Sequence, residues 1–309
     1  MTLLPFSRRA AGRPRPGSDA ALAAMAATAS VEVMPRTLAK VEDLPSLLPR
    51  GTRVYIAHID GTSIEDMVAA AARLSADGYT VMPHFPARII ADTATLDDWI
   101  RRYRDDAGVS EALLLAGGVA TPHGAFHSSM QLLETGLYDK HGFTRLHVAG
   151  HPEGNRDIDP DGGDAAVMEA LRWKQAFAER SDAEMGIVTQ FAFESEPLIA
   201  WADRLRDAGI TMPIHLGLAG PAKLQTLVRF AVTCGVGPSL RVLQRRAADV
   251  TKLVKPFEPT ALAAEIAAAP RPNIAGLHLF PLGGIAATAT WLAQMRGDDA
   301  ARAAQRGGV

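Results

Sequence analysis

The sequence predicts a single (β/α)8 TIM barrel of the α/β class, and three observations predict it. Eight short runs of apolar and β-branched residues recur along the chain between Ser30 and Phe280. Segments with the 3.6-residue apolar period of helices alternate with them, as in repeated β–α units around a parallel sheet. The eight units occupy about 270 residues, close to the usual size of such a barrel.

Each expected strand is short and apolar, and the helical segments follow the strands in turn. Pro221 suits the first turn of the helix after the seventh strand. The strands are expected at residues 30–34, 54–59, 79–82, 112–116, 145–149, 186–191, 213–217 and 275–280. The helices are expected at 64–76, 96–103, 128–134, 164–179, 196–208, 221–233 and 285–295, with a further helical region at 239–250 and 259–268.

An open doubly wound sheet is the main alternative to a barrel. That fold carries a glycine-rich dinucleotide turn after its first strand, whereas this chain has Pro35-Arg36-Thr37 there. We therefore expect one barrel domain over residues 29–296, with tails at 1–28 and 297–309. The arginine-rich start is similar to a twin-arginine signal or a transit peptide, but Pro14 and Pro16 interrupt any targeting helix and favour a flexible tail.

Composition and charge exclude several classes of partner. The 309 residues are 48% hydrophobic, enough for a large core, and 32 basic against 34 acidic residues leave a net charge of -2. This balance provides no field that attracts nucleic acid or an anionic membrane surface. No apolar run approaches the roughly 20 residues that span a bilayer. The single cysteine cannot form an internal disulfide, which fits a reducing, cytoplasmic environment.

Glu32 is the first candidate for chemistry. Active sites of such barrels lie at the carboxyl ends of the strands, and alternation along the first strand points Val31 and Val33 outward and Glu32 into the barrel mouth. Apolar neighbours desolvate an inward acid, so we expect its pKa to rise towards neutrality, which suits a general acid. The alternative is a structural ion pair with an inward arginine or lysine.

The same alternation places Gln190 inward with Val188, and His278 inward with Phe280. The nine histidines raise the question of a metal site, because several lie near the ends of expected strands. There is no His-x-His or His-Glu-x-x-His pair, and a lone histidine at a strand end is more often a hydrogen-bonding group than a ligand. We expect no metal. A histidine-rich metallohydrolase, which would hold stoichiometric zinc, is kept as an alternative.

Glycine-rich segments at the strand ends indicate a flat or anionic ligand. Gly117-Gly118, residues 150–155 and Gly217 allow the backbone to approach a ligand closely. Gly220-Pro221 follows the seventh strand, where many barrels bind phosphate. These segments predict an anionic ligand at the mouth.

Short motifs occur in a set order along residues 30–292. They are Ser-Val-Glu-Val-Met-Pro-Arg-Thr (30–37), Met-Pro-His-Phe (82–85), Leu-Leu-Ala-Gly-Gly (114–118), Val-Ala-Gly-His-Pro-Glu-Gly-Asn (148–155), Val-Thr-Gln-Phe-Ala-Phe-Glu (188–194) and Gly-Leu-His-Leu-Phe-Pro-Leu-Gly-Gly (276–284). In this order, and on strands of matching number, they resemble motifs of the methylenetetrahydrofolate reductase family. The family counterparts are a Ser-Phe-Glu-Phe-Pro-rich strand, Pro-His-Leu, Leu-Arg-Gly-Asp, Ala-Gly-Tyr-Pro-Glu-Gly-His-Pro, Thr-Gln-Phe-Phe-Phe-Asp and Phe-His-Phe-Tyr-Thr-Leu-Asn-Arg.

The resemblance implies a flavoprotein that reduces 5,10-methylenetetrahydrofolate to 5-methyltetrahydrofolate. Glu32 stands where the family has its catalytic acid, and Gln190 where it has the glutamine that holds the folate pterin. FAD would accept hydride from NADH or NADPH and deliver it to the folate-bound carbon. By this resemblance the substrate contacts are Gln190, Phe280 and Leu282, and the FAD contacts are His58, His84, Leu115, Ala116, Gly117, Gly118, Phe126, His127, His151, Glu153, Asn155 and Lys174.

The chain also departs from the family's pattern. Gly118 replaces an aspartate, His151 a tyrosine, Asn155 a histidine and Gly284 an arginine. These changes motivate two alternatives: an enzyme that oxidises methyltetrahydrofolate or uses a donor other than a nicotinamide, and a folate-binding barrel that has lost flavin. The choice between NADH and NADPH, the direction of reaction and the formation of a homo-oligomer stay open.

Overall fold

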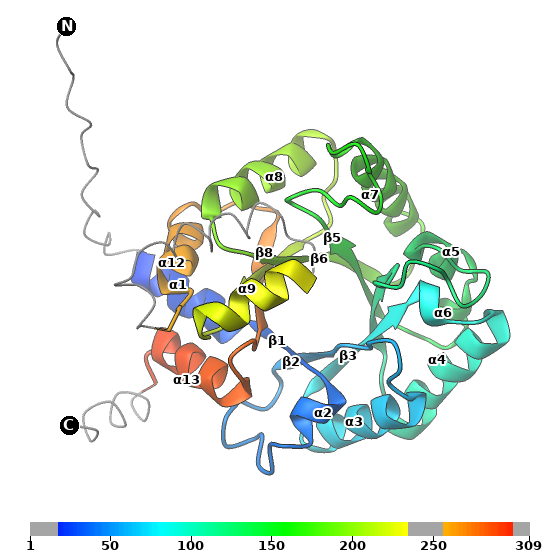
Figure 1. Ribbon diagram of the computed structural model, residues 1–309, viewed down its shortest axis with the longest axis horizontal. Coiled ribbons are helices and arrows are strands. Elements are labelled where there is room, and N and C mark those ends of the chain that lie inside the picture. Colours follow the sequence, from blue (N-terminus) through cyan, green and yellow to red (C-terminus); the bar gives the residue numbers. More distant parts are fainter. Residues whose placement is uncertain (1–17, 234–255, 299–309) are drawn as a thin grey trace, which may run out of the picture.

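The computed structural model describes residues 18–233 and 256–298 of the chain. Its strands form one closed barrel in sequence order, with every neighbouring pair parallel and β8 paired to β1. Helices surround the strands as an outer ring (Figure 1). The predicted (β/α)8 barrel is therefore confirmed. The strands are β1 (Ser30–Val33), β2 (Arg53–Ile56), β3 (Thr80–Pro86), β4 (Glu111–Leu115), β5 (Arg145–Gly150), β6 (Glu184–Ala192), β7 (Ile214–Ala219) and β8 (Ile274–Phe280).

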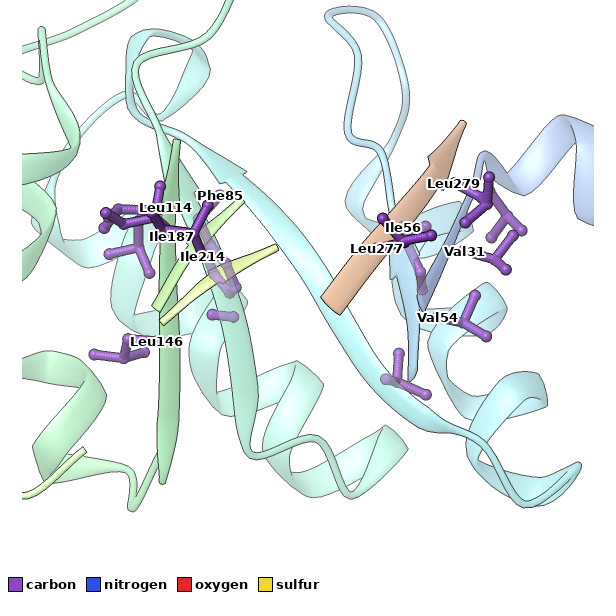
Figure 2. Close-up of a cluster of buried hydrophobic side chains, with 14 of the residues drawn as sticks. Val31, Val54, Ile56, Phe85, Leu114, Leu146, Ile187, Ile214, Leu277 and Leu279 are labelled. Carbon is purple, nitrogen blue, oxygen red and sulfur yellow. The ribbon is translucent and has the colours of Figure 1, made fainter. Parts of the chain in front are cut away.

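The outward faces of the strands carry the main hydrophobic core. Val31, Val54, Ile56, Leu277 and Leu279 have no exposed surface and pack between the strands and the helices that cover them (Figure 2). Aliphatic side chains fit this layer because a parallel barrel buries the outer face of each strand under helices. The expectation that the valines of the first strand point outward is confirmed.

The helix boundaries follow local capping signals. The Ser63 side chain accepts a hydrogen bond from Asp66 N at 3.1 Å at the start of α3, and Asp92 Oδ1 accepts one from Thr95 N at 2.7 Å at the start of α4. Gly108 ends α4 with a φ of 64°. The helices are α1 (Ser18–Ala27), α2 (Pro35–Leu38), α3 (Ile64–Ala76), η1 (Ala87–Ile89), α4 (Thr93–Ala107), α5 (Ser129–Glu134), α6 (Leu137–Lys140), α7 (Ala165–Ala178), α8 (Ser195–Asp207), α9 (Leu224–Thr233), α12 (Thr260–Ala268) and α13 (Ile285–Arg296).

Ion pairs fill the barrel at the amino ends of its strands. Glu111 of β4 bonds to Arg53 of β2 at 2.6 Å and lies 3.3 Å from Arg145 of β5, which also pairs with Glu184 of β6. An apolar layer lies above these ion pairs. It contains Tyr55, Met82, Leu113 and Val188, with Leu115 packed against it. The carboxyl ends of the strands therefore form the mouth in which a ligand can meet polar side chains.

Two regions differ from the sequence-based expectation. Residues 18–27, expected within a flexible tail, form α1, which buries Leu22 and Ala26 and packs against α12 and α13. Pro221 does not start a helix, because Ala222 forms a β-bridge with Phe257 and α9 begins only at Leu224. The expected helix at 239–250 lies outside the described residues. No helix within residues 18–233 and 256–298 is both long and apolar enough to cross a membrane.

Candidate active site

Glu32 lies on the inner face of β1, between the imidazoles of two histidines. Its Oε2 atom is 3.3 Å from Nε2 of His84 on β3 and 3.7 Å from Nε2 of His278 on β8. Both Nε2 atoms are buried and form no hydrogen bond with the described residues. The Glu32 side chain is 18% exposed, so a molecule in the mouth can reach it. The structure thus places a carboxylate and two imidazoles at one point of the mouth.

The charge state of Glu32 differs from our expectation. Burial raises the pKa of Glu32, but the polar contacts and the charges of His278 and His84 outweigh burial and lower this pKa to about 2. The prediction that the pKa of Glu32 lies near neutrality is therefore wrong for the protein by itself. The alternative ion pair with an arginine or lysine does not form either, because the inward Arg53 pairs with Glu111. Glu32 is ionised at neutral pH.

A group of polar rings from β2, β5, β7 and β8 lies inside the barrel. The hydroxyl of Tyr55 is 2.6 Å from His147 Nδ1, and His147 stacks on His215 with 4.9 Å between ring centroids. The Tyr55 ring also packs against His278 at 4.4 Å. Burial lowers the pKa of His147 well below its usual value and that of His215 to about 4, so both are neutral at pH 7. Alternation along β2, β5 and β7 would have revealed this group, which we did not predict.

Gln190 lies at an irregular point of β6. The register of β6 against β7 shifts between Val188 and Phe191. At this point the Thr189 hydroxyl accepts a hydrogen bond from Gly217 N at 2.8 Å and donates to Gln190 O at 2.8 Å. Gln190 is exposed although Thr189 and Phe191 are buried. Since helices cover the outer face of β6, this exposed side chain faces the open end of the barrel.

Four phenylalanines pack together beside the carboxyl ends of β6 and β8, and we call them the phenylalanine wall: Phe191, Phe193, Phe257 and Phe280. Their rings meet edge to face in a chain, with centroid distances of 5.8, 5.5 and 5.2 Å. Leucines of α9 pack against them, and Phe280 and Leu282 form a partly exposed edge of the cluster. The residues expected to contact substrate, Gln190, Phe280 and Leu282, therefore lie on the same side of the mouth.

On the opposite side, the end of β4 carries part of the expected FAD contacts. Leu115 packs on the inner apolar layer, and Ala116 O accepts a hydrogen bond from Arg88 N at 2.9 Å. Gly117 has a φ of 93°, a backbone conformation that favours glycine. Gly118 is exposed, and a Cβ atom added there would meet nothing within 4 Å. The loop after β4 thus presents backbone rather than side chains.

Lys174 and His151 lie next to each other beyond the end of β5. Lys174 of α7 is 7% exposed and forms no hydrogen bond or ion pair with the part of the chain that the structure describes. Burial lowers the pKa of Lys174 to about 8. Burial, followed by the charge of Lys174, lowers the pKa of His151 to about 4. A buried ammonium without a counterion is able to receive an anionic group of a ligand.

His58 and Phe126 are both buried. His58 stacks against Trp99 of α4 at 4.9 Å, and its Nε2 atom is 3.1 Å from Thr62 O. Phe126 is buried in the main hydrophobic core. Phe126 thus has protein partners, whereas Nδ1 of His58 is buried and forms no hydrogen bond with the described residues.

The other expected FAD contacts lie in the loops that follow β4 and β5. His127 is exposed, and its carbonyl accepts a hydrogen bond from Arg88 Nε at 3.2 Å. Asn155 Oδ1 accepts one from Asp157 N at 2.9 Å, which shapes the loop before α7. Glu153 is half-buried in the same loop. Arg88 also lies 3.9 Å from Asp157, so it connects the loops after β4 and β5.

The histidines do not form a recognisable metal site in the described ranges. Among residues 18–233 and 256–298, no group of three or more histidine, cysteine, aspartate or glutamate residues is arranged to hold a metal ion. The inner histidines instead contact Glu32, Ser30, Tyr55 and one another.

Comparison with known proteins does not assign a function to the chain. No protein-family model matches the chain. Among solved structures, the chain is similar to the carboxyl transferase domain of pyruvate carboxylase from Rhizobium etli, with a TM-score of 0.45 and 10% sequence identity. The match covers 98% of this chain and 54% of that one, so this chain spans about half its length. A likeness this distant carries no argument about function, which has to come from the residues of the mouth.

Proposed function

We propose that the protein is a flavin-dependent reductase that converts 5,10-methylenetetrahydrofolate to 5-methyltetrahydrofolate. One observation carries the proposal: Glu32 of β1 and Gln190 of β6 both open into one mouth. They are the two residues that correspond to the acid and the pterin-binding glutamine of the family that the motifs resemble. The phenylalanine wall and Lys174 lie on opposite sides of the mouth. This arrangement supports the proposal that two ligands meet over Glu32.

The residues on the Lys174 side fit a flavin. Lys174 supplies a buried positive charge without a counterion among the described residues, and the loop after β4 presents backbone at Gly117 and Gly118. His84 contributes a buried Nε2 atom that has no hydrogen bond with the described residues. We propose that these groups, with Leu115, Ala116 and His151, hold FAD. When bound, FAD supplies the hydride.

On the other side of the mouth, the protein holds and orients the folate. The Gln190 amide offers a donor and an acceptor, which match the donor and acceptor edge of a pterin. Phe280 and Leu282 provide a partly exposed apolar edge for the flat aromatic part of the substrate. Positioning of this kind lowers the barrier by holding the reacting carbon in place.

Proton transfer is assigned to Glu32 together with its histidines. Opening the five-membered ring of the folate requires a proton at a ring nitrogen, and a positioned acid contributes about 10²–10⁴ in rate. Because Glu32 is ionised in the protein by itself, the set of Glu32, His84 and His278 would take up a proton from solvent as substrate binds and then pass it to the ring nitrogen. The two imidazoles hold the carboxylate in place before and after the proton moves.

One observation favours a second candidate function, the oxidation of methyltetrahydrofolate. An ionised carboxylate is a proton acceptor, and the pKa of Glu32 is lowered to about 2 by His278 and His84 against the effect of burial. In the oxidising direction the ring closes and a nitrogen loses a proton, which Glu32 would accept. The same residues serve both directions, so the directions differ only in the electron donor or acceptor.

Rapid mixing of the purified protein tests both candidates. We expect a yellow protein. NADH, NADPH and methyltetrahydrofolate are each added alone, and the compound that is the electron donor bleaches the oxidised flavin. Bleaching by a nicotinamide, followed by reoxidation with methylenetetrahydrofolate, supports the reductase. Bleaching by methyltetrahydrofolate alone supports the oxidase. A colourless protein that takes up no FAD on reconstitution overturns both, and leaves the flavin-free folate-binding barrel.

A further inference from the structure

Tyr55 lies inside the barrel, beside the group formed by Glu32 and its two histidines. It is fully buried on β2 and is the register partner of Glu32 on β1. Its ring meets the His278 ring at a centroid distance of 4.4 Å and the His84 ring at 6.3 Å, both edge to face. Such distances are typical of packed aromatic pairs. One phenol ring therefore packs against both imidazoles that face the carboxylate.

The hydroxyl of Tyr55 is anchored on the far side of the barrel. Its oxygen lies 2.6 Å from Nδ1 of His147 on β5 and has no other hydrogen-bond partner among the described residues. The phenol therefore donates its hydrogen to Nδ1. His147 in turn stacks on His215 of β7. Gly186 leaves room for this pair, because a Cβ atom added there would lie 2.8 Å from Nε2 of His147. Two strands that do not neighbour β2 thus fix the position of the hydroxyl.

Apolar side chains confine the ring itself. Met82, Leu113 and Val188 form one buried cluster with Tyr55. A ring that is confined in this way and bonded at its oxygen cannot shift without leaving a buried hydrogen-bonding group unpaired, which is costly. By contrast, the Nε2 atoms of the two imidazoles form no hydrogen bond with the described residues. The rigid part of the group is therefore Tyr55, and the imidazoles rest against it.

We infer that Tyr55 is a positioning residue: its ring, anchored to His147 across the barrel, holds the imidazoles of His84 and His278 against the carboxylate of Glu32. Charge stabilisation falls with distance, so an imidazole that turned away would stop stabilising the ionised carboxylate. Burial would then raise the pKa of Glu32 unopposed. The consequence for proton transfer rests on the proposed function, whereas the positioning itself is a property of the protein without ligands.

The other charged groups of the barrel interior do not replace the two imidazoles. Besides Glu32 and its histidines, the charged or titratable groups around Tyr55 are Arg53, Glu111, Arg145, His147 and His215. The two arginines pair with Glu111, and the two histidines are neutral at pH 7 because burial lowers the pKa of each. The charges that act on Glu32 are those of His278 and His84. The protonation of Glu32 therefore reports where these two rings lie.

Carbon NMR of the full chain, with no flavin or folate added, tests the positioning. The ¹³C signal of the Glu32 carboxyl, assigned by its loss in Glu32→Gln, should not change between about pH 7 and about pH 4 in the unchanged protein, because the group stays ionised. Tyr55→Leu removes the ring. We then expect the protonation equilibrium of Glu32 to shift about a hundredfold, which moves its midpoint to about pH 4 and makes the signal titrate. Tyr55→Phe, which keeps the ring, should restore most of the constant signal.

Tyr103→Leu is the matched control. Tyr103 is equally buried, but it lies in the main hydrophobic core, where its ring packs against Phe85 at 5.3 Å. This change should destabilise the core in the same way and leave the Glu32 signal constant. A constant signal in folded Tyr55→Leu overturns the inference. So does the absence of proton–proton contacts between the Tyr55 ring and both imidazoles in the unchanged protein, a measurement that needs no variant to fold. Neither measurement uses flavin or folate, so failure of the proposed function would leave both tests unaffected.

Discussion

The Nε2 atom of His84 lies 3.3 Å from Oε2 of Glu32, and the same oxygen lies 3.7 Å from Nε2 of His278. The two imidazoles come from strands that do not neighbour each other, β3 and β8, so the closure of the barrel is what brings them to one carboxylate. This arrangement changes the chemistry of Glu32 from a desolvated acid to an ionised carboxylate. Its consequences can be measured residue by residue.

Replacement of Glu32 by glutamine tests the proton-transfer assignment. Because the amide keeps the shape but cannot exchange the proton, we expect folate reduction or oxidation to fall by about 10²–10⁴, measured in single turnover. Flavin content and the rate of flavin reduction by the donor should stay within about twofold. Loss of flavin from Glu32→Gln would contradict the assignment of Glu32 to the folate rather than to the flavin. Glu32→Asp, which keeps the charge, should retain part of the activity.

Lys174 is the residue to change for flavin affinity. Lys174→Met keeps the stem of the side chain and removes the buried charge, so we expect FAD to bind about tenfold more weakly, equivalent to about 1.4 kcal/mol. The stability of the protein without flavin should rise or stay the same, because an ammonium that burial disfavours has been removed. FAD affinity is measured by titration with FAD, followed by fluorescence quenching. The stability of the flavin-free protein is measured by urea unfolding.

The surface residue Lys140 is the matched control for this change. Its ammonium pairs with Asp97 of α4 at 2.8 Å on the outer ring, and its side chain is 59% exposed. Lys140→Met should leave FAD affinity unchanged. Equal FAD affinities of Lys174→Met and the unchanged protein would remove Lys174 from the flavin site.

Gln190 should act on folate alone. Since its side chain is exposed, Gln190→Ala should not destabilise the fold. Loss of the paired amide contacts should raise the folate KM or Kd about tenfold, while the flavin is still reduced by its donor at the same rate. Gln225→Ala, an exposed glutamine on α9, provides the control. A change in flavin reduction with unchanged folate affinity would assign Gln190 to the other ligand.

The buried histidines predict the response of stability to acid. Burial lowers the pKa of His215 from 6.5 to about 4 in the folded protein, whereas the unfolded chain titrates near 6.5. The unfolded state therefore binds more protons between these values, so this contribution is complete above pH 6.5 and is lost as the pH falls towards 4. We expect the free energy of unfolding to decrease by about 2 kcal/mol per buried histidine between pH 7 and pH 5.

Urea unfolding between pH 5 and pH 8 measures this effect. His215→Val should reduce the fall in the free energy of unfolding between pH 7 and pH 5 by the contribution of one buried histidine, because valine cannot bind the proton. His123→Gln changes a histidine that is 47% exposed and should leave the slope as it is. A protein that gains stability on going from pH 7 to pH 5 would contradict the assignment of His215 as a buried neutral group.

Local signals in the sequence were sufficient for the barrel and for the direction of Glu32. The alternation of Val31, Glu32 and Val33 and the recurring β–α pattern depend on periods of two and 3.6 residues, which are properties of neighbours along the chain. The identity of α3 followed in the same way, from Ile64 to Ala76, because its cap and its apolar period are local. The prediction of a tail at residues 18–27 was wrong, because α1 is stabilised by its packing on α12 and α13 rather than by its own weak apolar period.

Only the tertiary structure decided what surrounds each candidate. The register of β6 shifts between Val188 and Phe191, beside Gln190, where Thr189 bonds to Gly217 of the next strand. The charge of Glu32 depends on His84 and His278, which lie far from it in sequence, and on the burial of its own carboxylate. Alternation within a strand determines which face a side chain occupies, whereas its pKa is set by groups that other strands bring within a few ångströms. The sequence by itself determined that an acid points into the mouth, and the closed barrel decided that the acid is ionised.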